Sequence, residues 1–268
     1  MMKKKFMALI LAAVCTLSFA GCGSDKVESG EAPKSESSDV LADGVLTVGT
    51  NATFPPFEYV GDDGAPAGFD IALINAIGEE LGVKVQVEDM EFDSLVASIG
   101  SKIDVAIAGM TVTEERKEAV DFSEPYYDAV QYVLVKEGSE IASYDDLKGK
   151  TIGSQMGTTG DFISEDIKAE DDATNVSKYN KAIDAVNDLV NGRLDVVILD
   201  KNPAQVFAKE YEGIVALDGA DFGFETEQYA IALPKGNKEL VKKVNQALQK
   251  LKDNGTYDEL VKTYIETE

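Results

Sequence analysis

The sequence has 268 residues, of which 44% are hydrophobic and 28% are charged, proportions that are typical of a globular protein with a sizeable core. Its formal net charge of −24 excludes nucleic acid as a partner, because the phosphate backbone would repel the chain. The absence of histidine excludes Ser-His-Asp triads and His-based metal sites, and no cofactor is expected.

The first residues predict an export signal. Three lysines at positions 3–5 precede an apolar run over 6–20 that ends in small residues, which is the pattern of a signal peptide over residues 1–21. The run is shorter than the roughly 20 residues that a membrane-spanning helix needs, and no later segment approaches that length. Removal of this segment takes away three lysines and no acidic residue, which changes the formal charge from −24 to −27.

The segment LSFAGC at 17–22 resembles a bacterial lipobox, whose cysteine is acylated and becomes the mature N-terminus. Phe19 departs from the usual leucine. Cys15 lies in the removed stretch, so Cys22 is left alone and cannot form an internal disulfide. We expect a palmitate-bearing lipoprotein, anchored through Cys22 to the outer face of the cell membrane, or to its periplasmic side in a host with two membranes. The alternative is an ordinary signal peptide followed by an unpaired thiol.

Residues 22–44 follow as an expected flexible tether, because they are rich in Ser, Glu, Asp, Gly and Pro and poor in apolar residues. Period-two alternation then predicts strands over 46–50, 83–87 and 103–108. A helix with an isoleucine stripe is expected from Asp70, as its cap, to the closing residue Gly82, and Asp93 is expected to cap a shorter helix. Strands that alternate with helices imply a parallel sheet.

A weak internal repeat indicates two similar α/β lobes. The segment GSKIDVAI at 100–107 recurs, with a gap of one residue, as GRLDVVI at 192–198. Each copy follows an amphipathic helix, and the second of these is predicted over 181–190. The strand and polar loop at 47–53 likewise have a counterpart at 151–160. The last part of the chain predicts a strand over 228–233 and helices over 238–251 and 257–264.

Ligands of such sheets bind beyond the carboxyl ends of the strands. Four loops are therefore candidates for a binding site in a cleft between the lobes: 50–57, 108–116, 154–160 and 199–203. A zwitterion such as a free amino acid would need charge-assisted partners for both its carboxylate and its ammonium.

Arg116 is the best candidate for a carboxylate clamp, because its planar fork can bind both oxygens. Thr113 is expected to cap a short helix, which would place Arg116 beside exposed backbone N–H groups. Asp200 ends an apolar strand, where it could meet an ammonium. The alternatives are a surface ion pair for Arg116 and a turn or helix cap for Asp200.

Weaker candidates surround these two charges. The loop from Gly157 to Gly160 offers backbone donors and the hydroxyls of Thr158 and Thr159 ahead of a possible helix, although such a loop is a weak signal by itself. Phe54 and Phe92 could flank the aliphatic part of a ligand, whereas aromatic residues near strand ends are more often core.

Taken together, these fragments resemble the polar amino-acid ABC transporter binding proteins, solute-binding family 3, from about residue 45 to the end. The matching stretches are GTNATFPPFE (49–58), GFD (68–70), AGMTVT (108–113) with Arg116, DFSEPYY (121–127), DLKGK (146–150), GTT (157–159), GRLD (192–195) and GTY (255–257).

The resemblance implies a periplasmic-binding-protein-like fold of type II, in which two α/β lobes are joined by two crossover strands. Lobe 1 would comprise 45–132 and 228–268, and lobe 2 would comprise 133–227, with the crossovers near 132–136 and 228–233. It also implies that this exported receptor delivers a free amino acid to an ABC permease in the membrane, acting as a monomer and catalysing nothing.

The resemblance also implies roles for individual residues, and these roles agree with the candidates chosen from their charge. Arg116 would hold the ligand carboxylate together with the N–H groups of Thr111 and Thr159, while Gly109 and Asp200 would hold the ammonium. The aromatic pair at 54 and 92 would sandwich the side chain.

Departures from the family pattern bear on the substrate. Asn51 stands where cationic and glutamine binders that resemble this chain often carry Asp, so a neutral polar L-amino acid is favoured over arginine or lysine. Gln155 and Glu227 could contact a ligand side chain, or could be exposed. Two remoter readings stay open: an enzyme that resembles cyclohexadienyl dehydratase and uses carboxylates as acid and base, and a stand-alone amino-acid sensor.

Overall fold

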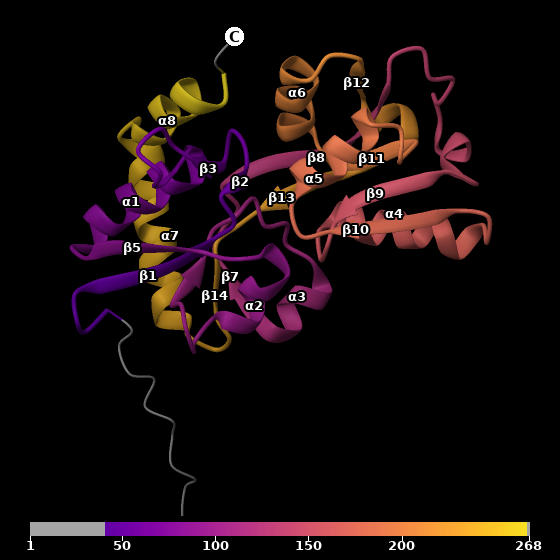
Figure 1. Cartoon of the computed structure of the whole chain (residues 1–268). Coiled ribbons are helices and arrows are strands. Elements are labelled where there is room, and N and C mark those ends of the chain that lie inside the picture. The colour runs from indigo at the N-terminus through magenta and orange to yellow at the C-terminus, as the bar shows by residue number, and fades with distance from the viewer. Residues whose placement is uncertain (1–40, 267–268) are drawn as a thin grey trace, which may run out of the picture. The chain divides into compact units, whose positions relative to one another are not determined.

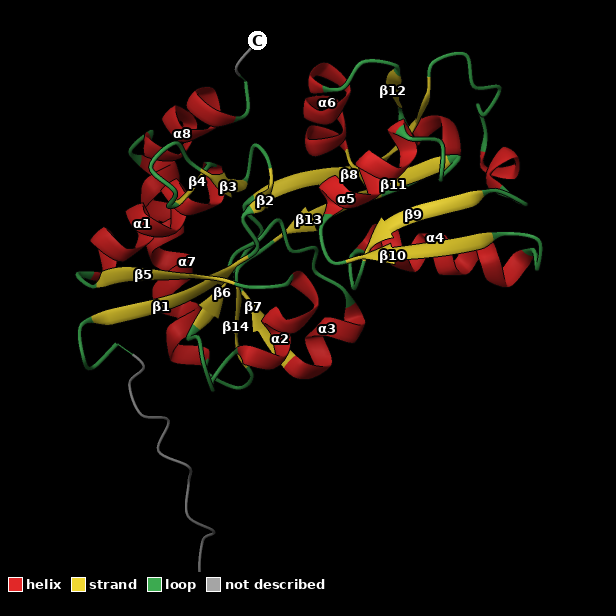
Figure 2. Ribbon diagram, viewed as in Figure 1, coloured by secondary structure: helices red, strands yellow, loops and turns green. Residues whose placement is uncertain are grey.

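The computed structural model describes residues 41–266. The expected signal peptide, the expected lipidation site Cys22 and most of the expected tether lie outside the described residues. Within 41–266, each helix is too short or too polar to traverse a bilayer. The described part of the chain folds into two α/β lobes, each built on its own sheet (Figures 1 and 2).

The sheet of the first lobe has the strand order β5-β1-β6-β14-β7. Its strands are β1 (Val45–Thr50), β5 (Lys84–Asp89), β6 (Val105–Ala106), β7 (Val120–Phe122) and β14 (Ala232–Pro234). β1 runs parallel to β5 and β6, as the alternation of strands and helices predicts. β14 returns from late in the chain and pairs antiparallel with β6 and β7, which makes the sheet mixed.

Helices cover this sheet and pack against one another (Figure 1). They are α1 (Phe69–Leu81), α2 (Leu95–Ser98), α3 (Glu114–Ala119), α7 (Lys238–Asp253) and α8 (Thr256–Tyr264). α1 contacts β5, α7 and α8, whereas α2 lies against β1 and α3 against β7. The predicted stripe of α1 is confirmed, because Ile71, Ile74 and Ile77 are buried, and Gly82 ends the helix in the left-handed conformation.

The sheet of the second lobe has the strand order β10-β9-β11-β8-β12. Its strands are β8 (Tyr127–Lys136), β9 (Thr151–Gln155), β10 (Asn175–Tyr179), β11 (Val196–Asp200) and β12 (Ile214–Leu217). Its helices are α4 (Thr159–Glu170), α5 (Ala182–Val190) and α6 (Lys201–Glu210). α4 and α5 both contact β9, β10 and β11, and α6 contacts β8 and β12.

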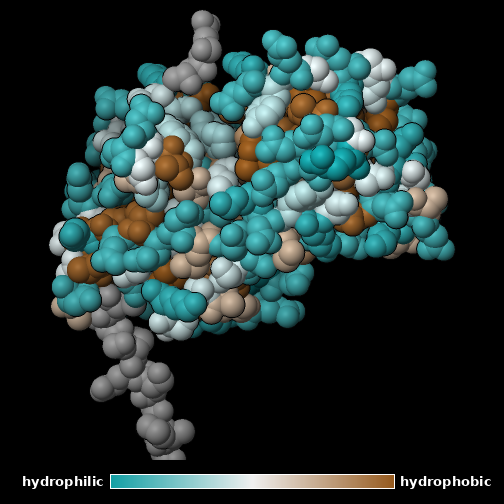
Figure 3. Space-filling model, in the orientation of Figure 1, coloured by the Kyte–Doolittle hydropathy of each residue, from teal (hydrophilic) through white to brown (hydrophobic). Residues whose placement is uncertain are grey.

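Shorter elements complete the described chain. A small antiparallel sheet contains β2 (Thr53–Phe54), β3 (Glu58–Val60) and β4 (Pro66–Ala67), and turns of 3-10 helix lie at Phe92–Ser94, Tyr144–Leu147 and Gly219–Phe222. On the face seen in Figure 3, hydrophilic side chains predominate and hydrophobic patches are scattered among them.

A pair of antiparallel strands runs between the two sheets. β13 (Thr226–Tyr229) pairs with the first part of β8, so that Glu227 lies opposite Ala129, and the rest of β8 pairs with β11 and β12. After β13 the chain enters β14 of the first lobe. The single strand expected over 228–233 is therefore two strands, one at the junction and one in the first sheet.

The internal repeat has a structural reason. Asp104 accepts a hydrogen bond from the backbone N–H of Thr47 through Oδ2 at 2.8 Å, and Asp195 accepts one from Thr151 in the same way, also at 2.8 Å. In each lobe this aspartate fixes the start of the neighbouring parallel strand. The repeated motif therefore has the same role in each lobe: it joins a helix to a strand, and its aspartate bonds to the neighbouring strand.

Two expected helix caps are wrong. Gly68, not Asp70, precedes α1, and Asp70 lies in the first turn with its carboxylate buried. Oδ2 of Asp70 accepts hydrogen bonds from the N–H of Gly109 at 2.8 Å and from the hydroxyl of Tyr126 at 2.7 Å. Asp93 lies within the 3-10 turn, and Ser94 precedes α2.

Candidate functional site

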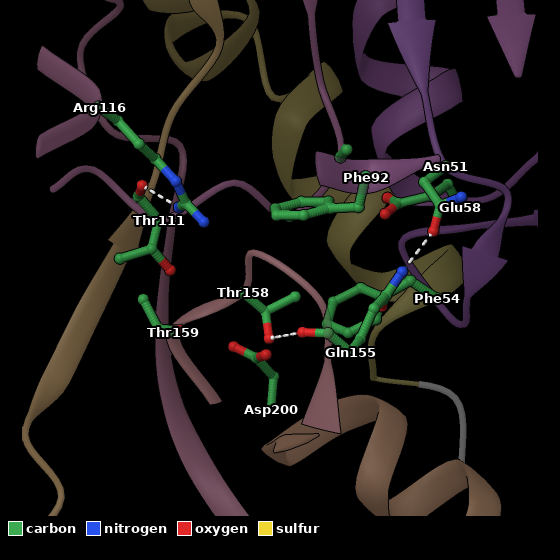
Figure 4. Close-up of a pocket in the computed structure, with 12 residues that line it drawn as sticks. Asn51, Phe54, Glu58, Phe92, Thr111, Arg116, Gln155, Thr158, Thr159 and Asp200 are labelled. Atoms are coloured by element: carbon green, nitrogen blue, oxygen red, sulfur yellow. Dashed lines mark hydrogen bonds between the residues drawn. The ribbon is translucent and has the colours of Figure 1, made fainter. Parts of the chain in front are cut away.

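One pocket gathers residues from all four loops that the sequence predicts, together with the loop after β5 (Figure 4). Its lining includes all ten predicted binding residues, and also two that were not predicted, Glu58 and Ala108. The ten are Asn51, Phe54, Phe92, Gly109, Thr111, Arg116, Gln155, Thr158, Thr159 and Asp200. The convergence follows from topology, because the carboxyl ends of parallel strands in both lobes face this pocket.

Arg116 is held at one end of the pocket by its own short helix. Thr113 is the N-cap of α3, as predicted, and its hydroxyl accepts a hydrogen bond from the Arg116 N–H at 3.1 Å. The guanidinium donates from Nη1 to the carbonyl of Thr111 at 2.6 Å and from Nη2 to the carbonyl of Gly157, in the second lobe, at 2.9 Å. Arg116 is only 8% exposed, which contradicts the alternative of a surface ion pair.

The environment of this guanidinium is partly apolar. Its Cζ lies 5.3 Å from the centre of the Phe92 ring, so one face of that ring packs against the cation. Burial lowers the pKa of Arg116, and the negative charges of Glu227 and Asp200 oppose that shift. An arginine remains charged in such a site. Carbonyl oxygens orient the guanidinium without neutralising it, so the site can attract an anionic ligand group.

Asp200 approaches the pocket from the second lobe. It ends β11 and precedes α6, but its side chain makes no capping hydrogen bond. Instead, Oδ1 accepts a hydrogen bond from the hydroxyl of Tyr229 at 2.6 Å. Burial, reinforced by the charge of Glu227, raises the pKa of Asp200 to about 7. A neighbouring cation would favour the ionised form, so this carboxylate suits an ammonium group.

The loop before α4 is fixed by its own side chains. The Thr158 hydroxyl caps α4 by accepting a hydrogen bond from the Asp161 N–H at 3.2 Å, and it donates to the Gln155 carbonyl at 2.7 Å. The Asp161 carboxylate in turn accepts a hydrogen bond from the N–H of Gly157 at 3.0 Å. Because the first N–H groups of a helix have no partner within it, the start of α4 offers donors to an anion.

Asn51 and Gln155 meet at the other end of the pocket (Figure 4). Gln155 Nε2 donates to Asn51 Oδ1 at 2.8 Å, which links the second lobe to the first. Asn51 Nδ2 donates to the carbonyl of Met90 at 2.8 Å. A carboxylate could not make that donation. The amide at position 51 is therefore engaged in holding the wall of the pocket.

Glu58 and Asp70 are two buried acidic residues close to the pocket. Glu58 lines the pocket, and its pKa is raised well above the usual range by burial first and then by the charge of Asp70. Burial also raises the pKa of Asp70 to about 6. Among the described residues, Oε2 of Glu58 and Oδ1 of Asp70 have no hydrogen-bond partner, and a proton shared between the two carboxyl groups would supply one for both.

One feature of the sequence points to Glu58, because an acidic residue there directly follows an apolar, proline-containing stretch. Glu58 lies in β3 and not beyond the end of a strand in either main sheet. The rule that ligands bind beyond the carboxyl ends of the strands therefore did not select it. Within 41–266, no group of three or more Cys, Asp or Glu side chains is arranged to hold a metal ion.

Comparisons with known proteins identify relatives of this chain. The family model for bacterial extracellular solute-binding proteins, family 3, matches residues 46–267. The chain is 34% identical to the arginine-binding extracellular protein ArtP of Bacillus subtilis, over 98% of each chain. It is 35% identical to the L-cystine-binding protein TcyJ of Escherichia coli, over 81% of each.

Solved structures show the same fold. An ancestral arginine-binding protein bound to arginine superposes with a TM-score of 0.78 at 42% identity, covering 83% of this chain and 98% of that one. An ancestral amino acid-binding protein described as a precursor of cyclohexadienyl dehydratase gives a TM-score of 0.77 at 34% identity, covering 84% and 97%. This chain therefore belongs to the bacterial extracellular solute-binding proteins, family 3.

Proposed function

We propose that this protein is the extracytoplasmic substrate-binding component of an ABC importer for a polar L-amino acid. The observation that carries the proposal is the pair of opposite charges, Arg116 from the first lobe and Asp200 from the second, that line one pocket. A zwitterion that bridges them would stabilise the closed arrangement of the lobes, because only that arrangement presents both partners at once. The permease would then recognise the closed form.

In this proposal the ligand carboxylate lies against Arg116 and the N–H groups of Thr111 and Thr159. Its ammonium lies against Asp200 and the backbone of Gly109. Gly109 has a φ of 53°, and a β-carbon there would come within 2.9 Å of the Phe54 ring, so the close approach of backbone and ring depends on glycine.

The side chain of the ligand would lie between Phe54 and Phe92 and extend towards Asn51 and Gln155. Those two amides are neutral and bond to each other and to backbone carbonyls, so they suit a neutral polar side chain of the ligand. We assign lobe 1 to 45–132 and 228–268, and lobe 2 to 133–227.

A cationic amino acid is the second candidate. Glu58 on the pocket wall favours it, since a lysine or arginine side chain would stabilise the ionised form of that carboxyl group. The arginine-binding relatives point the same way.

A thermal-shift screen separates these candidates. The purified protein is heated with each common L-amino acid, L-cystine and L-ornithine, and a ligand that binds the folded state raises the melting temperature. The largest rise with a neutral polar amino acid supports the first candidate, and the largest rise with arginine, lysine or ornithine supports the second. No rise with any of these ligands would overturn the proposal.

We further infer that the protein catalyses no reaction. The dehydratase alternative is tested by incubating the protein with arogenate or prephenate and looking for an aromatic product. Formation of phenylalanine or phenylpyruvate at a rate that Glu58→Gln abolishes would establish an enzyme instead.

Lipid anchoring through Cys22 is a separate part of the proposal, supported by the sequence at 17–22. Replacing Cys22 by Ser should move the protein from the membrane fraction into the soluble fraction, because the attached acyl chains would be lost. Retention of the Cys22→Ser variant in the membrane fraction would contradict the anchor. Native mass spectrometry of the released protein should show a monomer.

A further inference from the structure

Glu227 lies on the strand that runs between the lobes and contacts both. Its Oε2 accepts a hydrogen bond from the hydroxyl of Thr111 at 2.6 Å and another from the hydroxyl of Thr159 at 2.8 Å. Thr111 follows β6 in the first lobe, and Thr159 begins α4 in the second. One carboxylate oxygen on β13 therefore joins two threonines that belong to different lobes.

The bond to the second lobe is part of a longer chain of hydrogen bonds. Gln131 on β8 is fully buried, and its Nε2 donates to the Thr159 hydroxyl at 3.0 Å. That hydroxyl accepts from Gln131 and donates to Glu227, so both of its hydrogen-bonding roles are used. Hydrogen bonds to a carboxylate are stronger than those between neutral groups. Glu227 is therefore the strongest acceptor in this series of hydrogen bonds.

Glu227 also acts on Arg116 through charge. Burial lowers the pKa of Arg116, and the negative charge of Glu227 is the largest influence that opposes this shift. The guanidinium donates to the carbonyls of Thr111 and Gly157, which carry no net charge. Glu227 therefore stabilises the charged form of Arg116 in a site where burial disfavours it.

The position of Glu227 separates it from the ligand. Thr111 and Thr159 line the pocket described above and also a second hollow, formed by β13, the start of α3 and α4. Glu227 is among the residues that line the second hollow and not among those that line the first. It reaches the two threonines from behind the pocket.

We propose that Glu227 is a positioning residue that latches the two lobes together through the hydroxyls of Thr111 and Thr159. The latch makes closure partly independent of the ligand, and it aligns the two backbone segments that receive the ligand carboxylate. Its effect on ligand release rests on the proposed function, whereas its effect on the compactness of the protein does not.

The first test measures ligand release. Dissociation of L-arginine, and of L-glutamine, is followed by stopped-flow competition for wild type, Glu227→Ala, Glu227→Gln and Glu225→Ala. Glu225 is exposed and lies two residues away, so its replacement is a matched control for the loss of one carboxylate. Loss of a charged acceptor should raise the dissociation rate about tenfold in Glu227→Ala. Equal rates in Glu227→Ala and Glu225→Ala would overturn the latch.

A double-mutant cycle tests the route of the effect. Thr111→Val combined with Thr159→Val removes both donor hydroxyls and should raise the dissociation rate by a similar factor. Adding Glu227→Ala to this pair should raise the rate by less than about twofold further, because partners that act as one unit are not additive. Full additivity would show that Glu227 does not act through these hydroxyls.

The second test needs no ligand. Small-angle X-ray scattering of the ligand-free protein should give a larger radius of gyration for Glu227→Ala than for wild type and Glu225→Ala. If Glu227→Ala does not unfold cooperatively, Glu227→Gln replaces it, since it keeps an acceptor oxygen and should show a smaller change of the same sign. Equal radii in all variants would contradict the latch. If no amino acid binds wild type but the radii differ, the proposed function fails and the latch stands.

Discussion

Arg116 combines two properties that oppose each other, a permanent charge and a nearly buried position. Backbone carbonyls from both lobes fix its fork, and the negative charges of Glu227 and Asp200 favour its charged form. The pattern around it in the sequence predicted the cap at Thr113 but not the carbonyl of Gly157, which comes from the other lobe. A long-range partner of this kind leaves no trace in local spacing.

Replacing Arg116 by Ala should lower the affinity for the best amino acid about a hundredfold, because two charged hydrogen bonds to its carboxylate are lost. Isothermal titration calorimetry measures this change. Arg193→Ala is the matched control, since Arg193 is the other arginine, is 61% exposed and pairs with Asp188. An affinity for Arg116→Ala within a factor of two of wild type would show that the clamp is assigned wrongly.

Asp200 predicts a dependence of affinity on pH. Its pKa is raised to about 7, so below that value the carboxyl group must lose a proton before it can bind an ammonium. We expect the association constant to rise up to about tenfold per pH unit between about pH 5 and pH 7 and to level off above. Calorimetry in a buffer series measures this. A flat profile over that range in wild type, or the same slope in Asp200→Asn, would argue against the role.

Glu58 predicts a dependence of stability on pH. Because its pKa is raised in the folded state, the folded protein binds more protons than the unfolded chain once the pH exceeds the unfolded value, about 4.3. The free energy of unfolding therefore falls as the pH rises through that window. Glu58→Gln removes this contribution, so its unfolding free energy in urea should fall less from about pH 5 to about pH 8 than that of wild type. Parallel pH profiles would contradict the raised pKa.

At the scale of elements, α3 shows how a short helix positions a functional side chain. Thr113→Ala removes its cap and should lower the free energy of unfolding by about 1 kcal/mol, with a weaker ligand affinity because Arg116 loses its support. Chemical denaturation and calorimetry measure the two effects. Thr113→Ser keeps the hydroxyl and should match wild type in both. If Thr113→Ala behaves like Thr113→Ser, the cap does not position the clamp.

Local patterns predicted the helices and most strands, since periodicity and capping chemistry act over a few residues. Asp70 shows where this reasoning fails. Aspartate is a favoured N-cap residue, but Asp70 lies in the first turn of α1. Its carboxylate accepts hydrogen bonds from the N–H of Gly109 and the hydroxyl of Tyr126, which are both distant in the sequence. β14 is a similar case, because it pairs with β6 and β7, which come much earlier in the sequence.

At the scale of the whole molecule, the residues that line the pocket span 51–200 and come from both lobes. The rule that ligands bind beyond strand ends selected four of the contributing segments, but not the loop that carries Phe92 or the strand that carries Glu58. It could not reveal the hydrogen bonds between the lobes, such as the one from Gln155 to Asn51 and the two at Glu227, because these depend on how the sheets face each other.

Closure should be visible in solution. If the ligand bridges the lobes, saturating wild type with its best amino acid should lower the radius of gyration measured by X-ray scattering, since the closed form is more compact. Asp200→Asn should require a higher ligand concentration for the same decrease. A radius that is the same with and without a saturating ligand would contradict closure around it.

The central claim is that one bound amino acid joins Arg116 and Asp200 across the pocket. A crystal structure of wild type with the amino acid that gives the largest thermal shift tests this most directly. We predict the ligand carboxylate within hydrogen-bonding distance of the Arg116 guanidinium and its ammonium against the Asp200 carboxylate. A ligand seated away from both groups would contradict the account.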